Sequence, residues 1–119
     1  MKKIIFTLLI LASGLFTAKA DTEPSFPGGE TALKKFITEN TRYPQISRDN
    51  GVEGIILVGF IVMTDGSLNN VKVIRFVDPD LESEALRVVA LMPAWIPAQK
   101  DGAPIEAPSK VEIPFILEE

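Results

Sequence analysis

Side chains that commonly carry out catalysis are scarce in this chain of 119 residues, which contains no histidine and no cysteine. The usual general base near neutral pH and the usual ligands of zinc are therefore missing. The serines from Ser25 onward fall in expected turns and helix caps, where no neighbouring base would activate them. Ser109 and Lys110 are adjacent, but neighbouring residues of a strand point to opposite faces. We therefore expect no nucleophilic catalysis.

A run of acidic residues, Asp78 to Glu84, is the other candidate for chemistry. Glu82 and Glu84 are two residues apart, a spacing that separates them on a helix, so we interpret them as a solvated first turn. The run also lacks the central glycine and the spacing of a calcium loop. Gly28-Gly29 follows no strand and precedes no suitably placed lysine, so it does not resemble a phosphate loop. The sequence predicts a protein that is not an enzyme, with no cofactor and no metal site.

The first 20 residues have the pattern of a secretory signal peptide. Lys2 and Lys3 precede an apolar run from residue 4 to residue 16, and Ala18-Lys19-Ala20 forms a small-residue cleavage site. An uncleaved anchor is the alternative, although the run is shorter than the roughly 20 residues that span a bilayer. We expect cleavage after Ala20, a periplasmic location, an extended lead-in at 21–27 and one domain at 28–119.

Removing the signal peptide makes the remaining chain more acidic. Without its three lysines, nine basic residues stand against 16 acidic ones, a net charge of −7. A domain with this net charge lacks the basic surface that binds nucleic acid, and it repels anionic lipid. We expect no nucleic-acid partner and no stable membrane insertion after cleavage. The charge fits basic partners or simply keeps the protein in solution.

Hydrophobic periodicity predicts two helices and three strands. Leu33, Phe36 and Ile37 share one face of a helix over 30–40. The apolar run 52–63, Asp65-Gly66 and the alternating segment 68–74 form a hairpin pattern. Asp78 or Asp80 caps a helix that begins near Pro79 and buries the stripe Leu81, Ala85, Val88, Val89 and Met92.

The remainder of the chain contains a proline-rich segment and one further strand. Residues 94–108 read as a loop anchored by Trp95, the only tryptophan, and residues 111–117 alternate as a last strand. The order helix, strand, strand, helix, strand predicts an α+β fold, a three-stranded antiparallel sheet packed against two helices.

The first strand is apolar on both of its faces. If Ile56 and its alternating partners face the helices, then the outward side chains are Ile55, Leu57, Ile61 and Met63. An antiparallel sheet with one solvated face normally alternates apolar and polar residues. We expect this outer face to be covered by a second copy, giving a homodimer, or by another protein. Cover by the proline-rich segment 98–108 is the alternative.

The ordered motifs of the chain resemble the C-terminal domain of TonB, in its FPGG-type variety, over almost all of the sequence after residue 25. They are Phe26-Pro27-Gly28-Gly29, Tyr43-Pro44, Gly51, Gly54, Asp65-Gly66, Glu84-Ala85-Leu86-Arg87, Met92-Pro93-x-Trp95-x-Pro97 and Ile113-Pro114. The resemblance implies a periplasmic module that grips the TonB box, a short segment of an outer-membrane transporter, in energy-coupled transport. The box would add as a strand to the edge of the last strand.

Carried onto this sequence, the resemblance implies two contact regions. The segment before the first strand corresponds to Asn40, Thr41, Arg42, Tyr43 and Pro44. The receiving edge corresponds to Lys110, Val111, Glu112, Ile113, Pro114 and Phe115. Structural alternatives are that Tyr43 packs with its hydroxyl satisfied, that Pro44 only ends a helix and that Trp95 fills the core.

Two departures from the family pattern bear on mechanism. Only residues 21–27 separate the predicted cut from the domain, which favours modulation or adaptation over mechanical pulling. Pro114 lacks an N–H group, which fits an edge strand but shortens or shifts strand addition if that position faces the partner. The alternatives are an adapter that binds a sensor or assembly partner through the same edge and apolar face, and a cryptic enzyme or small-ligand carrier.

Overall fold

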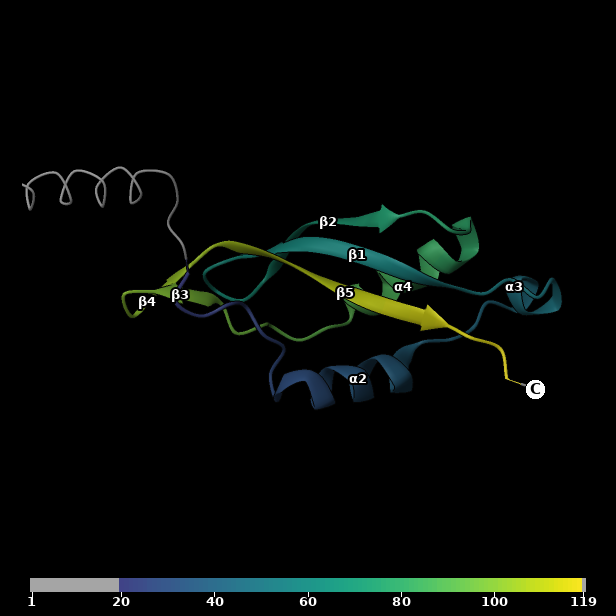
Figure 1. The fold of residues 1–119 in the computed structure, drawn as a ribbon, viewed down its shortest axis with the longest axis horizontal. Coiled ribbons are helices and arrows are strands. Elements are labelled where there is room, and N and C mark those ends of the chain that lie inside the picture. Colours follow the sequence, from purple (N-terminus) through teal and green to yellow (C-terminus); the bar gives the residue numbers. More distant parts are fainter. Residues whose placement is uncertain (1–19, 119) are drawn as a thin grey trace, which may run out of the picture.

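The computed structural model describes residues 20–118, and the predicted signal peptide lies almost entirely outside them. Figure 1 shows the fold. The elements in chain order are α2 (Gly29–Asn40), α3 (Gln45–Asp49), β1 (Gly54–Val62), β2 (Leu68–Arg75), α4 (Pro79–Ala90), β3 (Ala98–Lys100), β4 (Ala103–Ile105) and β5 (Ala107–Phe115).

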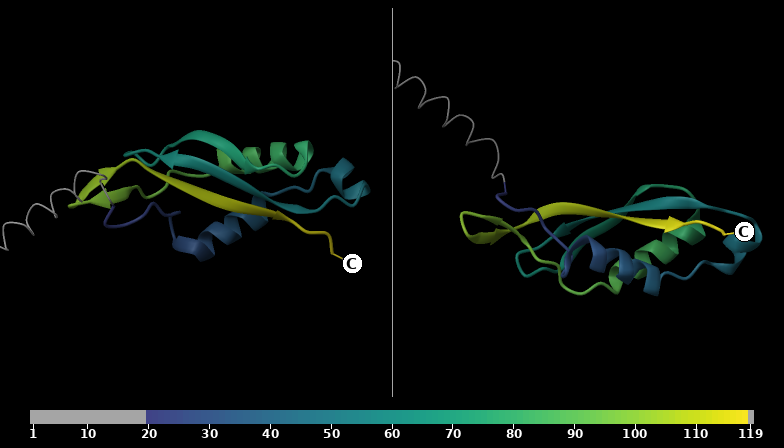
Figure 2. Two further views of the ribbon diagram at one scale, coloured as in Figure 1. Left: turned by 45° about the horizontal axis from the view of Figure 1, so that its top comes forward. Right: turned by 60° about the horizontal axis from the view of Figure 1, so that its bottom comes forward.

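The main sheet has three antiparallel strands in the order β2-β1-β5. The helices α2 and α4 lie on one side of it, α2 beneath β5 and α4 beneath β1 and β2, so the domain has two layers (Figures 1 and 2). This arrangement confirms the predicted α+β fold.

The core lies between the sheet and the helices. Alternate residues of β1 are buried, with Ile56, Val58 and Val62 fully enclosed, and they meet the predicted stripe of α4. Leu33 and Ile37 of α2 complete the cluster. Burial of these apolar side chains is the main stabilising contribution to the fold.

The start of α4 is capped as the sequence predicts. The Asp78 carboxylate accepts hydrogen bonds from the backbone N–H groups of Asp80 and Leu81, each at 3.1 Å. Pro79 occupies the first turn, where a missing N–H has no helical partner to lose.

Trp95 fills the core beside the β1–β2 turn. Its ring makes edge contacts with Phe60 and Phe26, at centroid distances of 5.1 and 5.9 Å, and it is 5% exposed. Its backbone N–H donates to the carbonyl of Gly66 at 2.9 Å. Trp95 is therefore the predicted core anchor, and it ties the loop after α4 to the hairpin turn.

The structure differs from the sequence predictions in several elements. The last strand, expected over 111–117, runs over Ala107–Phe115 as β5 and so begins four residues earlier. A short helix, α3, follows Pro44 and was not predicted. Within the segment expected to be a loop over 94–108, β3 and β4 form a two-stranded hairpin. The lead-in pairs with this segment through bridges from Thr22 to Gln99 of β3 and from Ser25 to Ile96, just before β3. Strand pairing satisfies the backbone groups that a loop would leave to water.

Within residues 20–118, no helix has the length and apolar character needed to cross a membrane.

Candidate functional site

The two edges of the main sheet differ in regularity. β5 pairs with β1 over nine consecutive residue pairs, from Gly54 opposite Phe115 to Val62 opposite Ala107. The ladder between β1 and β2 has two irregularities, and Asn70 of β2 has a positive φ of 51°. Bulges of this kind blunt an edge against further pairing. Among the described residues β5 is thus the regular edge strand with one side unpaired.

The side chains of β5 alternate between the core and solvent. Val111, Ile113 and Phe115 are buried, whereas Lys110, Glu112 and Pro114 are exposed. The predicted receiving residues therefore form one continuous edge, and they divide into a core-facing set and a solvent-facing set.

Two prolines show which backbone groups of β5 face the open side. Within a ladder proline is placed where its missing N–H is not needed by the neighbouring strand. Pro108 and Pro114 are six residues apart, so the twofold alternation of the strand directs both nitrogens to the same side. We infer that this is the open side, and that the N–H groups facing it within β5 belong to Lys110 and Glu112. Pro114 therefore leaves no N–H donor at that end of the open edge.

A groove runs between the open edge of β5 and α2. Its larger part, about 490 Å³, reaches from α2 over the edge to the outer face of the sheet. A smaller part, about 300 Å³, continues toward Pro114. The residues that line the two parts are Glu30, Leu33, Lys34, Ile37, Thr38, Ile55, Leu57, Arg75, Lys110, Val111, Glu112 and Pro114.

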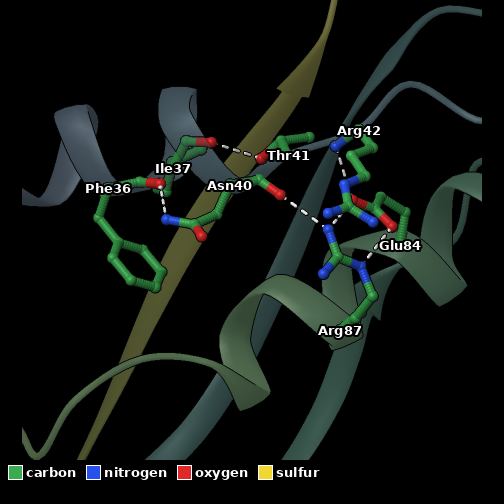
Figure 3. A network of polar contacts seen from close by, with 7 residues as sticks. All are labelled: Phe36, Ile37, Asn40, Thr41, Arg42, Glu84 and Arg87. Carbon is green, nitrogen blue, oxygen red and sulfur yellow. Dashed lines mark hydrogen bonds and ion pairs between the residues drawn. The ribbon is translucent and has the colours of Figure 1, made fainter.

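The predicted contact segment begins at the end of α2. The Asn40 amide donates to the carbonyl of Phe36 at 2.8 Å, and the Thr41 hydroxyl donates to that of Ile37 at 2.6 Å. These bonds satisfy carbonyl groups of the last turn, which have no partner within the helix. Figure 3 shows the segment leaving the helix toward α4.

Glu84 and Arg87 of α4 hold this segment in place (Figure 3). The guanidinium of Arg87 donates to both carboxylate oxygens of Glu84, at 2.9 and 2.7 Å, and to the carbonyl of Asn40 at 2.7 Å. The other bond to Glu84 comes from the backbone N–H of Arg42, at 2.7 Å. The Arg42 side chain is exposed. We call this set of bonds the α4 clamp.

The clamp corrects the sequence interpretation of Glu84. The sequence pattern predicts a solvated carboxylate, but the Glu84 side chain is only 11% exposed. The hydrogen bonds from Arg87 lower the pKa of Glu84, against the opposing effect of burial, and the Arg42 N–H adds to the lowering. The carboxylate therefore stays charged and acts as a structural acceptor.

Tyr43 joins the contact segment to β5. Its ring makes an edge contact with Phe115 at 5.5 Å, and its hydroxyl donates to the carbonyl of Val52. Burial raises the pKa of the Tyr43 hydroxyl, and the charge of Glu53 raises it further. Pro44 is the residue before α3. The structural alternative for Tyr43 is thus realised, whereas Pro44 precedes α3 and does not end α2, whose last residue is Asn40. The contact segment lies at the carboxyl end of β5.

The outer face of the sheet keeps its apolar row. Ile55 is 40% exposed, and Leu57, Ile61 and Met63 are half-buried. Ile74 of β2 crosses over Gly59, where an added Cβ would come within 2.6 Å of it. The hairpin β3–β4 lies beyond the end where β5 begins (Figure 1), whereas Ile55 and Leu57 pair with the other end of β5. The alternative prediction, that segment 98–108 covers this row, is therefore wrong for the row as a whole, because Ile55 and Leu57 lie at the far end.

The structure is a small α+β domain in which the regular edge strand β5 is paired on one side only. A family model described as the Gram-negative bacterial TonB protein C-terminal matches residues 39–117, and the chain belongs to this family. The resemblance seen in the sequence motifs is confirmed.

The relatives and solved structures agree with this assignment. Protein TonB of Helicobacter pylori strain J99 is 35% identical over 53 residues, and that of strain 26695 is 32% identical over 53 residues. Each match covers 44% of this chain but only 19% of the relative. Two NMR solution structures of the Helicobacter pylori TonB C-terminal domain have TM-scores of 0.56 and 0.55 at 26% identity. The first match covers 73% of this chain and 78% of the solved domain. The second covers 75% of this chain and 94% of the solved domain.

Proposed function

We propose that this chain is a periplasmic protein-binding module that docks a short extended segment of an outer-membrane transporter in energy-coupled transport. The segment adds as a strand to the open edge of β5. The observation that carries the proposal is the contrast between the regular edge of β5 and the bulged edge of β2. Main-chain hydrogen bonds then supply affinity, and the groove beside α2 supplies specificity.

The contact segment bounds this docking site at one end. The α4 clamp fixes the backbone of residues 40–42, and Tyr43 rests on Phe115 of the receiving strand. The exposed side chain of Arg42 is then free to meet the docked segment. A site with one rigid end requires little ordering when the partner binds, which favours affinity.

Export is the second part of the proposal, with cleavage after Ala20. The residues that follow already belong to the fold, because the backbone N–H of Asp21 donates to the carbonyl of Gln99 at 2.7 Å. The intact mass of the protein isolated from the periplasm tests this directly. A mass that includes residues 1–20 would show an anchored chain instead.

In-cell photo-crosslinking tests the docking. A photoreactive residue at Glu112 probes the open edge, and one at Arg42 probes the contact segment while keeping the backbone N–H that the clamp uses. The same residue at Asp80, exposed at the start of α4 and away from both the open edge and the outer face of the sheet, is the control. Crosslinks from the first two sites to the N-terminal segments of outer-membrane transporters support the proposal.

The second candidate is an envelope adapter that binds a sensor or assembly partner. The half-exposed apolar row at Ile55, Leu57, Ile61 and Met63 favours it, because such a face commonly marks an interaction surface. A homodimer through this row would bury it equally well. Crosslinks from Glu112 to another envelope protein, or only to a second copy, would favour this candidate and exclude the transporter role.

A further inference from the structure

The open edge of β5 sets the register of the added strand. This inference rests on the proposed docking function. Because Pro108 and Pro114 carry no N–H, the donors that face the partner are those of Lys110 and Glu112. An added strand makes its fullest set of hydrogen bonds when two of its residues, separated by one, lie opposite these two positions. Three consecutive partner residues therefore occupy fixed places.

The side chains of these three partner residues face alternate sides. The two that lie opposite Lys110 and Glu112 project to the outer face, where those side chains are exposed. The middle one lies opposite Val111, which is 4% exposed, and projects toward α2. Leu33 and Ile37 of α2 line the groove there. The middle partner residue is therefore apolar.

Charge on the outer face distinguishes the two outer partner residues. Across the sheet, Lys110 pairs with Gly59, which pairs with Lys72. Gly59 has no side chain, and the side chain of Ile74 lies over it. The two charged side chains of this row of paired residues are therefore both basic, although Glu23 of the lead-in lines the same hollow as Lys110. Opposite charges directly across a strand pair stabilise it and like charges destabilise it. This partner residue is therefore acidic.

The neighbouring row of paired residues, which contains Glu112, favours a basic partner residue. Glu112 pairs with Leu57, which pairs with Arg75, so an acidic side chain stands next to the partner in this row. A basic partner residue therefore fits here. Glu30 and Lys34 of α2 also line the groove, but they lie on its inner side and carry one charge of each sign.

We propose that the docked segment carries a basic, an apolar and an acidic residue in that order from its N-terminus. This order follows if the strand adds antiparallel to β5, as every pair of the existing sheet does. The basic residue lies opposite Glu112, the apolar one opposite Val111 and the acidic one opposite Lys110. Lys110 and Glu112 are then the residues that determine specificity.

Two nonapeptides of identical composition test this order. One has Lys-Val-Glu at its centre and the other Glu-Val-Lys, both within the same serine and threonine flanks. Binding to the isotope-labelled protein is followed by the NMR shifts of the Lys110 and Glu112 amides at 150 mM salt. We expect Lys-Val-Glu to bind about tenfold more tightly, and the double variant K110E/E112K to reverse that preference.

The outcomes separate this inference from the function on which it rests. Equal binding of both peptides, with shifts at the two amides, would overturn the charge order and leave strand docking intact. A preference for Glu-Val-Lys in the natural protein would likewise overturn it. Failure of both peptides to move the two amides at millimolar concentration, with no crosslink from Glu112 in cells, would overturn the docking itself.

Discussion

Replacing Glu112 with proline is expected to weaken strand docking while leaving the domain folded. Glu112 is exposed, and we have placed its N–H on the open side of β5. The substitution therefore removes a docking donor without breaking a bond to β1. Proline at the buried neighbour Val111 is the matched control, because that N–H belongs to the ladder with β1 opposite Val58. The two variants differ by one position along the strand.

The two substitutions differ in their expected effect on stability. A surface change away from special features alters the free energy of unfolding by about 0.5 kcal/mol or less. In Val111→Pro the lost ladder bond and the buried carbonyl left without a donor together cost about 3 kcal/mol. For a domain of this size that lowers the melting temperature by about 12 to 24 °C. Glu112→Pro should shift it by only a few degrees.

Docking should respond in the opposite way. Loss of one of the two donors of the edge removes about 0.5 to 1.5 kcal/mol of binding free energy, which weakens peptide affinity about 2- to 13-fold. Glu112→Ala keeps the N–H and separates this effect from the loss of charge. Thermal unfolding and peptide titration of the three variants give the required numbers. If Glu112→Pro destabilises the domain as much as Val111→Pro does, the assignment of the open side is refuted.

The other predictions concern the turn, the clamp and the outer face. Gly66→Ala should lower the free energy of unfolding by about 2 kcal/mol or more beyond the loss caused by Gly29→Ala. Both glycines have a positive φ, but only at Gly66 would the added Cβ lie 2.3 Å from a carbonyl oxygen. Equal losses of the two variants in urea unfolding would argue against this clash. Glu84→Gln should lower the free energy of unfolding most above pH 4.5, the ordinary glutamate pKa, because the folded pKa is lower and the natural carboxylate stabilises only while charged. The difference between variant and natural protein should shrink as the pH falls through the folded pKa; a difference independent of pH would contradict this. Replacing Leu57 and Ile61 with threonine should convert any dimer to monomer in analytical ultracentrifugation, and unchanged mass and stability would exclude the outer face as a shared surface.

Local signals in the sequence were sufficient to predict the layers of the fold. The alternation of Ile56, Val58 and their neighbours, the Asp65-Gly66 turn and the Asp78 cap each depend on residues close together in the chain. Their physical basis is a period of two or of 3.6 residues, or a single side chain beside a helix end. The structure has each of them where the sequence predicts it, within two residues at the strand ends.

What the sequence could not supply was pairing between distant segments. Glu84 and Arg87 have the spacing of a local ion pair, but their partners at Arg42 and Asn40 lie more than 40 residues away. No periodicity connects the two regions, so Glu84 was interpreted as a solvated residue. The hairpin β3–β4 was missed for a related reason, since prolines around it predict a loop and its pairing with the lead-in is also non-local.

The pairing of the lead-in with β3 has a mechanical consequence. Thr22 and Ser25 bond to Gln99 and Ile96 through a short ladder at the end of the molecule where β5 begins. A load applied through residue 20 is carried first by these few bonds, which open one after another because the ladder ends at the point of loading. The nine-pair ladder between β1 and β5 is not loaded until they have opened. The lead-in therefore acts as a compliant element in series with a stiff one, and it yields first whenever the domain is pulled from its amino-terminal side.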